Sequence, residues 1–455
     1  MDVTRDLDVR LAHARDVSGL ELVPEGVARA ESVEDVIELV KESASNSTAI
    51  TPAGSQTSMT GASITDRGVL LSMRGMNRVL DIDIDRRIVR VEPGATIGDV
   101  NRTLAEASLL FPPDPTSEND ATIGGAIACN ASGARSLFYG ATRAHVAGVR
   151  VIHADGSDLW YRRAHPEKNA VGYYAAQDPV DWLVGSEGTL GIVVEAELSL
   201  VELPAVTTGL AIPFRSLARA LSFVIGARED AQRKAMCLEL FDEESLQLSA
   251  THARTPWDND ARAMIYLEDS LRADEDLDIV LDHWLTLAET HEAIVGDIRV
   301  YQSAADLRQA RVMRHAVPAS MNELGATYRS QGGRKVSTDW AVPYARLGEA
   351  LAFSEQAVAR HQSPRPVTYG HAGNGHPHQN FIAESEEMVG RVNAAVEETL
   401  HFVIGIGGTV SAEHGLGKLK SHWMPLQMNE KQRDVMRALK NTLDPRGIFS
   451  PGNIF

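Results

Sequence analysis

One stretch of this chain has very few bulky side chains, and this limits what it can fold into. Residues 122–143, TIGGAIACNASGARSLFYGATR, are mostly Gly, Ala, Ser and Asn. Because such residues let a backbone come close to its neighbours, the stretch favours contact with something flat or charged. A second loop, PAGSQTSMTG at residues 52–61, offers successive N–H groups and hydroxyls. A pyrophosphate-binding nest requires this pattern, although many Ser/Thr/Gly loops are ordinary connections.

Length and charge narrow the class of protein. A chain of 455 residues implies two or three structural units and can bury a large core without disulfides. Its two cysteines, Cys129 and Cys237, fit a reducing cytosol. The net charge of -18 disfavours nucleic-acid binding, which needs clustered Lys and Arg. The charged first residues do not resemble a secretory signal, and no run approaches the roughly 18–20 apolar residues of a membrane span. We therefore expect a soluble, cytoplasmic protein.

The pattern of helices and strands changes near Pro204. Beyond it, longer helical patterns alternate with short strands, which is typical of an α+β arrangement. The expected helices cover residues 32–42, 97–107, 217–229, 277–289, 306–324, 345–360 and 430–443, and the expected strands cover residues 68–73, 88–92, 146–153 and 191–203.

Two common nucleotide-binding fingerprints are absent. No G-x-G-x-x-G stands in a strand–turn–helix setting near either end, which disfavours a Rossmann dinucleotide site. The segment HGLGKLK has a lysine after glycines, but Ala412 stands where a P-loop would need its upstream glycine. The loop at 52–61 is therefore the better candidate for holding a nucleotide phosphate.

Several long motifs occur in one order. PAGSQTSMTG, DPTSENDATIGGAIACNASGARSLFYGATR, HADG and GSEGTLGIVVEAEL resemble the FAD-binding PCMH-type domain of the vanillyl-alcohol oxidase superfamily. YGHAGNGHPHQN, AEHGLGK and LDPRGIFSPGNIF resemble its D-lactate, glycolate and D-2-hydroxyglutarate dehydrogenase branch. The resemblance implies an α+β fold with a two-subdomain FAD-binding domain at 1–204. An α+β cap domain with an antiparallel sheet would follow at 205–410, and a C-terminal segment at 411–455 would return to the FAD domain.

The resemblance also assigns the flavin site by position. The pyrophosphate would lie on main-chain amides of the loop at 52–61, and the small-residue stretch would line the isoalloxazine and ribityl groups. The residues assigned are Gly54, Ser55, Gln56, Thr57 and Ser58 for the pyrophosphate, Pro115, Thr116, Thr122, Gly124, Gly125, Asn130, Ser132, Gly133 and Gly140 for the isoalloxazine and ribityl region, and Glu187, Gly188 and Ile192 for the adenine side. Some members of the superfamily attach flavin through a histidine in the pyrophosphate loop. Because this loop contains neither His nor Cys, we expect noncovalent FAD.

The segment HAGNGHPHQN predicts a hairpin. The Asn-Gly pair at 374–375 is the strongest two-residue turn signal that a sequence offers. With that turn, His371 would lie opposite His378, with Cβ atoms roughly 4.5–5.5 Å apart. Asn380, two residues beyond His378, would share its face. His376 has the same parity, and the hairpin pattern leaves its part open. Two imidazoles placed in this way can share one metal.

A histidine pair needs at least one more ligand to hold a metal. The resemblance favours His371 and His378 and makes Glu413, in SAEHGLG, the third ligand. A set of two histidines and a glutamate leaves open positions for substrate oxygens and suits Zn²⁺, while Mn²⁺ and Fe²⁺ also fit. The alternative is that these histidines only hydrogen-bond within a polar strand pair.

These residue types suit the oxidation of a D-2-hydroxy acid. The reaction removes a hydride from Cα, which flavin accepts, and a proton from the hydroxyl. A bound cation lowers the pKa of that hydroxyl, and His414 would take its proton near neutral pH. The alternative role for His414 is to cap a loop before a glycine.

The substrate carboxylate is best held by a fork-shaped cation. Arg314 stands where the family places its carboxylate-binding arginine. Arg311 and Arg308 precede it on the same expected helix, so a shift of one turn is an alternative, as is a solvated basic helix face.

Two departures from the family pattern bear on specificity. The 2-hydroxyglutarate enzymes carry a lysine two residues before an aspartate, and here Ser337 precedes Asp339. This favours a monocarboxylate substrate, although Lys335 would replace that lysine if its strand parity allows. In the tail, the family's N-P-G-K appears as S-P-G-N at 450–453, which leaves no role assigned to those side chains.

Two other functions compete with this one. A flavin enzyme of the alkylglycerone-phosphate synthase type would share the fold, but its tyrosine-bearing active-site segment has no match here. A non-enzymatic interaction module would be expected to lose the glycine loops or the His/Glu set, and both are intact. The electron acceptor would be external: a quinone, an electron-transfer flavoprotein, a cytochrome or an iron–sulfur subunit. A homodimer is compatible with the sequence.

Overall fold

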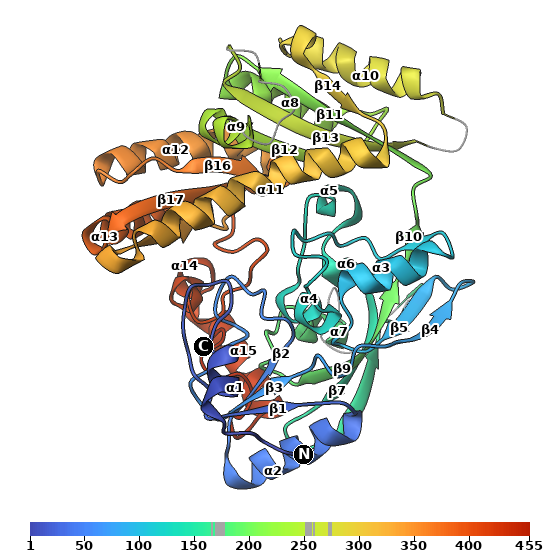
Figure 1. The fold of residues 1–455 in the computed structure, drawn as a ribbon, viewed down its shortest axis with the longest axis vertical. Coiled ribbons are helices and arrows are strands. Elements are labelled where there is room, and N and C mark those ends of the chain that lie inside the picture. The colour runs from blue at the N-terminus through green and yellow to red at the C-terminus, as the bar shows by residue number, and fades with distance from the viewer. Residues whose placement is uncertain (165–166, 169–177, 251–256, 258–259, 272–274) are drawn as a thin grey trace. The chain divides into compact units, whose positions relative to one another are not determined.

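The computed structural model of this chain separates into two compact units (Figure 1). It describes residues 1–164, 167–168, 178–250, 257, 260–271 and 275–455. Unit 1 comprises Met1–Gly133, Tyr139–Leu203 and Glu413–Phe455, and unit 2 comprises Ala134–Phe138 and Pro204–Ala412. Among the described residues, no helix has both the length and the apolar content that crossing a membrane requires.

Unit 1 combines short helices with small sheets. Its elements are α1 (Leu7–Ala12), β1 (Gly26–Arg29), α2 (Val33–Asn46), β2 (Ile50–Ala53), β3 (Val69–Ser72), β4 (Val79–Asp83), β5 (Ile88–Val91), α3 (Ile97–Ala105), β6 (Leu109–Leu110), α4 (Ile123–Cys129), α6 (Thr142–His145), β7 (Val146–Ile152), β8 (Asp158–Arg162), α7 (Pro179–Leu183), β9 (Ile192–Ser199), β10 (Val201–Glu202), the 3-10 helix η5 (Ser421–Trp423), α14 (Met424–Gln427) and α15 (Glu430–Leu443).

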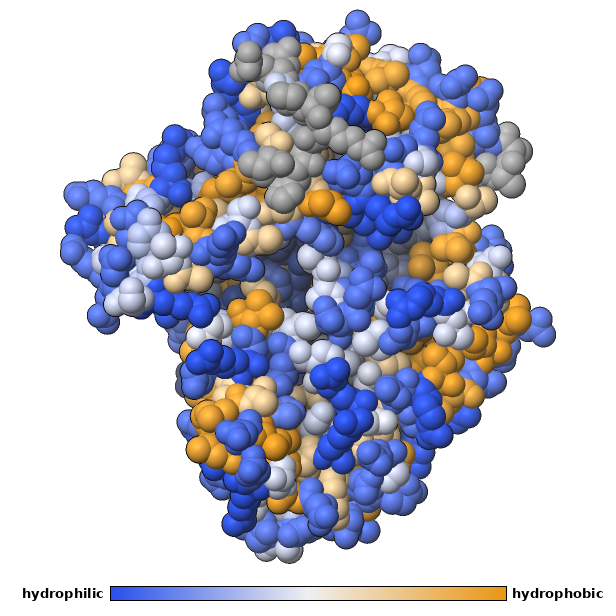
Figure 2. All heavy atoms as spheres, in the orientation of Figure 1, coloured by the Kyte–Doolittle hydropathy of each residue, from blue (hydrophilic) through white to orange (hydrophobic). Residues whose placement is uncertain are grey.

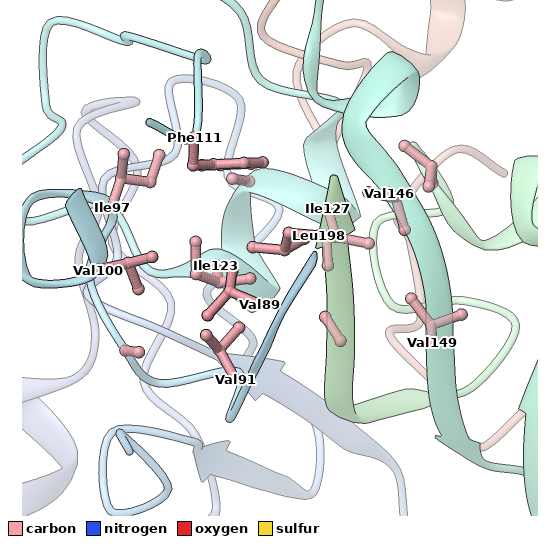
Figure 3. Packing of buried hydrophobic residues seen from close by; sticks show 14 of the residues in the cluster. Val89, Val91, Ile97, Val100, Phe111, Ile123, Ile127, Val146, Val149 and Leu198 are labelled. Atoms are coloured by element: carbon pink, nitrogen blue, oxygen red, sulfur yellow. The ribbon is translucent and has the colours of Figure 1, made fainter. Parts of the chain in front are cut away.

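Two sheets organise unit 1. Strands β1, β3 and β2 form a parallel sheet in that order, and the C-terminal segment joins it where Phe449 bridges Ile50. Strands β4, β5, β9, β7 and β8 form an antiparallel sheet. Figure 3 shows the apolar side chains of β5, β7 and β9 packed against those of α3 and α4, with Ile123 and Ile127 from α4 in the middle of the cluster. This burial fixes helix α4, which carries much of the small-residue stretch.

Unit 2 is built around one large sheet. Its elements are most of α5 (Ser136–Tyr139), β11 (Val206–Phe214), α8 (Leu217–Glu229), β12 (Cys237–Asp242), α9 (Glu243–Ala250), β13 (Ala263–Leu271), α10 (Leu277–Thr290), η1 (Val295–Asp297), β14 (Arg299–Tyr301), α11 (Ala304–Thr327), η2 (Arg329–Gln331), β15 (Gly332–Ser337), η3 (Tyr344–Arg346), α12 (Leu347–Arg360), β16 (Val367–Gly370), η4 (Ala372–Asn374), β17 (His378–Ser385) and α13 (Glu386–Gly405).

The sheet of unit 2 is antiparallel and has the order β14-β11-β13-β12-β16-β17-β15. Helix α11 runs along one face of it (Figure 1), where Met313 and Val317 share an apolar cluster with Cys237 and Phe241 of β12. Ser303 and Asp306 form a capping box that fixes the start of this long helix. Helix α11 therefore covers the sheet face that carries the polar residues described below.

The structure confirms the predicted α+β fold, with an antiparallel sheet in the second unit and a tail that returns to the first. Helices α8 and α15 have the bounds that the hydrophobic pattern predicts, and α3, α10, α11 and α12 differ from their predictions by a few residues. Strand prediction is less sharp, because the run at 191–203 divides into β9 and β10.

On the face drawn in Figure 2, apolar residues form patches separated by hydrophilic ones.

Candidate active site

Polar side chains form a row across the sheet face that α11 covers. They come from neighbouring strands, because Tyr369 of β16 pairs with His378 of β17, and Asn380 of β17 pairs with Ser337 of β15. Two contacts with α11 confirm which face this is. Arg314 donates from Nε to Glu239 Oε2 of β12 at 2.7 Å, and Lys335 of β15 donates to Asn322 Oδ1 at 2.5 Å. A sheet face packed on a helix is usually apolar, so such a row points to a binding site.

Three histidines meet at the end of β16 and β17. The ring centroids are 5.2 Å apart for His371 and His378, 4.5 Å for His376 and His378, and 5.4 Å for His371 and His376. Each ring has a nitrogen that lies within 4.8 Å of one from each of the others. His371 and His376 are buried, with 3% and 2% of their surface exposed. Three neutral imidazoles in this arrangement can hold a divalent metal.

The hairpin that brings these histidines together differs from the prediction. His378 pairs with Tyr369, not with His371, so the predicted register is wrong. Instead of a two-residue turn, residues 372–374 form the 3-10 helix η4, and the N–H groups of Asn374 and His376 both bond to the carbonyl of His371. Tertiary contact explains the change, since the carbonyl of Gly375 accepts a bond from the N–H of Val342 at 3.0 Å. The histidines meet because the loop folds back, and the loop also brings in His376.

Buried carboxylates lie beside two of the rings, and that of Glu239 is hydrogen-bonded to His371. His371 Nδ1 lies 2.6 Å from Glu239 Oε1, and His376 Nε2 lies 3.2 Å from Asp339 Oδ1. Glu239 is also paired with Arg314, whose terminal nitrogen lies 3.5 Å from the ring nitrogens of His371. In metal sites, a carboxylate that accepts one N–H of an imidazole fixes the tautomer and directs the other nitrogen to the metal.

The predicted substrate-binding residues occupy this same face. Asn380 is buried and donates from Nδ2 to the hydroxyl of Tyr369 at 2.9 Å. Ser337 lies beside it in register, and its hydroxyl is buried. Lys335 is two residues farther along β15, so its strand parity is that of Ser337, and burial lowers its pKa to about 8. Arg314 joins the same region from α11, and its contact with a substrate carboxylate stays a prediction.

Many of the predicted flavin-binding residues lie together in unit 1. Gly54 is so close to Thr122 that a Cβ at Gly54 would come within 2.1 Å of the threonine hydroxyl oxygen. A Cβ at Gly133 would likewise come within 2.2 Å of the main-chain carbonyl oxygen of Asp114, the residue before Pro115. The loop at 52–61 therefore meets the start of α4, and the middle of the small-residue stretch meets the segment before Thr116. At Gly133 main chain approaches main chain, and at Gly54 it approaches the small side chain of Thr122, as a cradle for an extended dinucleotide requires.

Several predicted flavin residues also hold the unit together. Gln56 has a φ of 56° and donates from Nε2 to the carbonyls of His13 and Arg15. Asn130 caps α4 in the left-handed region, and its Oδ1 accepts the N–H of Arg143. Ser58 Oγ accepts N–H groups from within its own loop.

The remaining flavin residues differ in their surroundings. Ile192 packs into a core cluster of unit 1, and a Cβ at Gly188 would meet the ring of Pro52. Thr122 caps the first turn of α4, where its hydroxyl accepts the N–H of Gly125. Gly140 has a φ of 85°, which favours glycine. The flavin contacts of these residues stay predictions, as do those of Ser55, Thr57 and Gly124.

The loop that carries Glu413 and His414 is anchored within unit 1. The Ser132 hydroxyl donates to Glu413 Oε1 at 2.8 Å, and the Thr60 hydroxyl donates to the His414 carbonyl at 3.2 Å. Glu187 accepts the N–H groups of Leu416 and Gly417 at 2.7 and 2.8 Å, one with each carboxylate oxygen. Burial raises the pKa of Glu187 to about 7, although these two bonds oppose the shift.

Sequence reasoning did not identify Glu239 and Asp339 as partners of the histidines. Both carboxylates are almost completely buried, with 1% and 2% of their surface exposed. Their only signal in the sequence is a charged residue inside an apolar strand pattern, as in the strand Cys237–Asp242. Such a residue is rarely buried unless it is paired.

The fold and the small-residue cradle together define a flavin-dependent oxidoreductase, and comparison with known families agrees. Residues 24–161 match the model of the FAD binding domain, and residues 203–454 match the model of the C-terminal domain of FAD linked oxidases. Because the second match covers more than half of the chain, the protein belongs to the family of FAD-linked oxidases of the PCMH type.

Curated relatives resemble the chain along nearly its whole length. The glycolate oxidase subunit GlcD of Bacillus subtilis is 28% identical over 98% of this chain and 92% of its own. A D-lactate dehydrogenase of Anaerostipes hadrus is 26% identical, and a D-2-hydroxyglutarate dehydrogenase of Xanthomonas citri pv. viticola is 28% identical, each over 95% of this chain and 89% of its own.

Solved structures share the fold. An alkyldihydroxyacetonephosphate synthase superposes with a TM-score of 0.74 at 18% identity, covering 99% of this chain and 82% of its own. An identity this low carries information about the fold alone.

Proposed function

We propose that this enzyme oxidises a D-2-hydroxy acid to the 2-oxo acid with noncovalently bound FAD and a divalent metal, most simply Zn²⁺, with Mn²⁺ or Fe²⁺ as alternatives. The observation that carries the proposal is the histidine cluster, which lies on a polar sheet face beside a buried Arg–Glu pair. The glycolate, D-lactate and D-2-hydroxyglutarate relatives support the substrate class, because their names cover short 2-hydroxy acids.

His371 and His378 are proposed as metal ligands, with Glu413 as a third. Imidazole and carboxylate donors fit Zn²⁺, Mn²⁺ and Fe²⁺. The position of Glu413 in the chain supports its role as a ligand. The N–H of the preceding residue, Ala412, bonds to the carbonyl of Asp339 at 2.7 Å. Asp339 is the residue that lies against His376. When bound, the metal supplies positive charge that lowers the pKa of the substrate hydroxyl.

His414 is proposed as the base. One of its ring nitrogens would take the hydroxyl proton as the substrate loses a hydride from Cα. FAD, when bound, supplies the acceptor for that hydride. The anchored loop suits this role, because the Thr60 contact with the His414 carbonyl fixes the main chain beside the ring.

Arg314 is proposed to bind the substrate carboxylate, with Asn380 beside it on the sheet face and Lys335 farther along. A planar guanidinium orients a carboxylate better than an ammonium does. Ser337 gives the strand no charge at the position beside Asn380, and Lys335, which has the same parity, bonds to Asn322 of α11, so a monocarboxylate is the favoured substrate. The reduced flavin would be reoxidised by an external acceptor, such as a quinone, an electron-transfer flavoprotein, a cytochrome or an iron–sulfur subunit. A cytoplasmic location is proposed from the composition alone.

Alanine variants of the proposed ligands and of the base separate these roles. His371→Ala, His378→Ala and Glu413→Ala should each lose metal, because an incomplete set holds it poorly. His414→Ala should keep both metal and FAD yet lower 2-oxo acid formation from D-lactate or glycolate about 10²–10⁴-fold. The measurement is elemental analysis together with trapping of the 2-oxo acid in the presence of an artificial electron acceptor.

The roles are wrong if His414→Ala loses metal while His371→Ala keeps it. A wild type that forms no 2-oxo acid from any substrate, yet catalyses a non-redox exchange on the flavin, would favour the alkylglycerone-phosphate synthase alternative. If the wild type stays active after complete removal of metal, the histidine cluster is a hydrogen-bonded network and not a metal site.

A further inference from the structure

His376 lies closer to His378 than His371 does, although the proposed ligand set leaves it out. Its ring centroid is 4.5 Å from that of His378, compared with 5.2 Å for His371. It is also as deeply buried as His371, with 2% of its surface exposed. Its nearness to the two other rings puts His376 within reach of any metal that they hold.

A buried carboxylate lies beside His376, as one lies beside His371. The His376 Nε2 lies 3.2 Å from a buried carboxylate oxygen of Asp339, as His371 Nδ1 lies 2.6 Å from Glu239. Asp339 is itself fixed, because its Oδ2 accepts the hydroxyl of Ser411 at 2.7 Å. His376 Nε2 and Asp339 Oδ1 are close without forming a hydrogen bond, so Asp339 places negative charge beside the ring and does not fix its tautomer.

The main chain holds His376 in place. Its N–H bonds to the carbonyl of His371 at 3.1 Å. The preceding residue, Gly375, has a φ of 67°, and a Cβ there would lie 1.9 Å from the carbonyl oxygen of Val342. Glycine is therefore required at 375, and the tight turn that it permits directs His376 into the cluster.

The charges near the cluster favour a cation. Glu239 and Asp339 bring two buried carboxylates beside three imidazoles, and Arg314 pairs with one of them. Buried carboxylates are costly unless they are paired or coordinate a metal, directly or through a histidine. A divalent ion held by the imidazoles would be attracted by both carboxylates.

We propose that His376 is a third imidazole ligand, so that unit 2 supplies a set of three histidines to the metal. The inference rests on the proposed metal site of His371 and His378. Asp339 would contribute negative charge beside His376, while Glu239 is hydrogen-bonded to His371. The metal would then have His371, His376, His378 and Glu413 as protein ligands.

X-ray absorption at the zinc edge of the full-length, Zn²⁺-loaded protein counts the imidazoles directly. Three imidazoles are expected in the wild type and two in His376→Asn. The apparent Kd for Zn²⁺ should rise by more than about tenfold in His376→Asn, since loss of a ligand costs at least as much as loss of its orienting partner. Asp339→Asn should show a smaller rise and keep three imidazoles.

His361→Asn is the matched control, because His361 pairs with Glu398 at 2.7 Å outside the cluster. Its Zn²⁺ affinity and imidazole count should equal those of the wild type. Two imidazoles in the wild type, or a His376→Asn Kd within about twofold of the wild-type value, would overturn the inference while leaving the proposed metal in place. A wild type that takes up neither Zn²⁺, Mn²⁺ nor Fe²⁺ would overturn both the inference and the metal part of the proposed function.

Discussion

Arg314 has a structural partner as well as a proposed substrate. Its Nε donates to Glu239 at 2.7 Å, and Glu239 is 1% exposed. Removing one member of a buried ion pair leaves the other charge without compensation, which costs about 3–5 kcal/mol. Substitution of Arg314 must therefore change stability as well as substrate binding, and the two effects need separate measurements.

A double-variant cycle separates them. Arg314→Ala should lower the unfolding temperature clearly, and adding Glu239→Gln should recover part of the loss, because the unpaired charge is gone. Arg314→Ala and the double variant should both show a strongly raised KM for the hydroxy acid, while Arg314→Lys should raise the KM less. Thermal unfolding and steady-state kinetics test this. A KM that stays at the wild-type value in Arg314→Ala would move the carboxylate contact to Arg311 or Arg308.

The sequence predicts individual residues well where a motif supplies their chemistry. His371 and His378 were expected to meet, and they do. His376 was left open, because strand parity alone cannot tell which histidines a folded-back loop brings together. Glu239 and Asp339 were not expected, since their partners are distant in the sequence and only the tertiary fold brings them together.

At the scale of elements, the helices follow the hydrophobic pattern because amphipathic periodicity repeats over many residues. The hairpin at 367–385 does not follow its local turn signal. An Asn-Gly pair favours a two-residue turn, but the bond from Val342 to Gly375 and the 3-10 bonds to His371 stabilise a longer loop. Tertiary contacts therefore set the register that the sequence alone assigns incorrectly.

The anchor of the loop after Glu413 gives a pH-dependent prediction. Burial raises the pKa of Glu187 from 4.5 to about 7, with Lys418 and Lys420 acting in the opposite direction. A group with a raised folded pKa contributes stability that is fully present below its unfolded pKa and is lost as the pH rises through the folded value. The contribution of Glu187 should therefore fall between about pH 4.5 and 7, by about 3 kcal/mol at most.

Glu187→Gln cannot titrate, so the difference in stability between wild type and variant should shrink over that pH range. Asp444→Asn is the matched control, because Asp444 is also buried and also accepts two main-chain N–H groups, from Ile448 and Phe449. Thermal unfolding across a series of buffers checks this, and a parallel pH response in both variants would contradict the assignment to Glu187.

At the scale of the whole molecule, each unit carries a distinct part of the proposed chemistry. Unit 1 holds the small-residue cradle and the loop with His414, and unit 2 holds the histidine cluster and Arg314. The fold was predicted from several long motifs in one order, which no single loop could have established. Substrate identity could not be predicted in the same way, because a few side chains on one sheet face decide it.

The central claim is that the bound flavin oxidises a D-2-hydroxy acid. The most direct test is anaerobic, single-turnover mixing of the purified holoprotein with paired D and L enantiomers of lactate and 2-hydroxyglutarate, and with glycolate, while the flavin absorbance is followed. The oxidised flavin spectrum should be lost with at least one D enantiomer or glycolate, and should change much more slowly or not at all with the matching L enantiomers. A flavin that stays oxidised with every compound, or that the L enantiomers reduce faster, would contradict it.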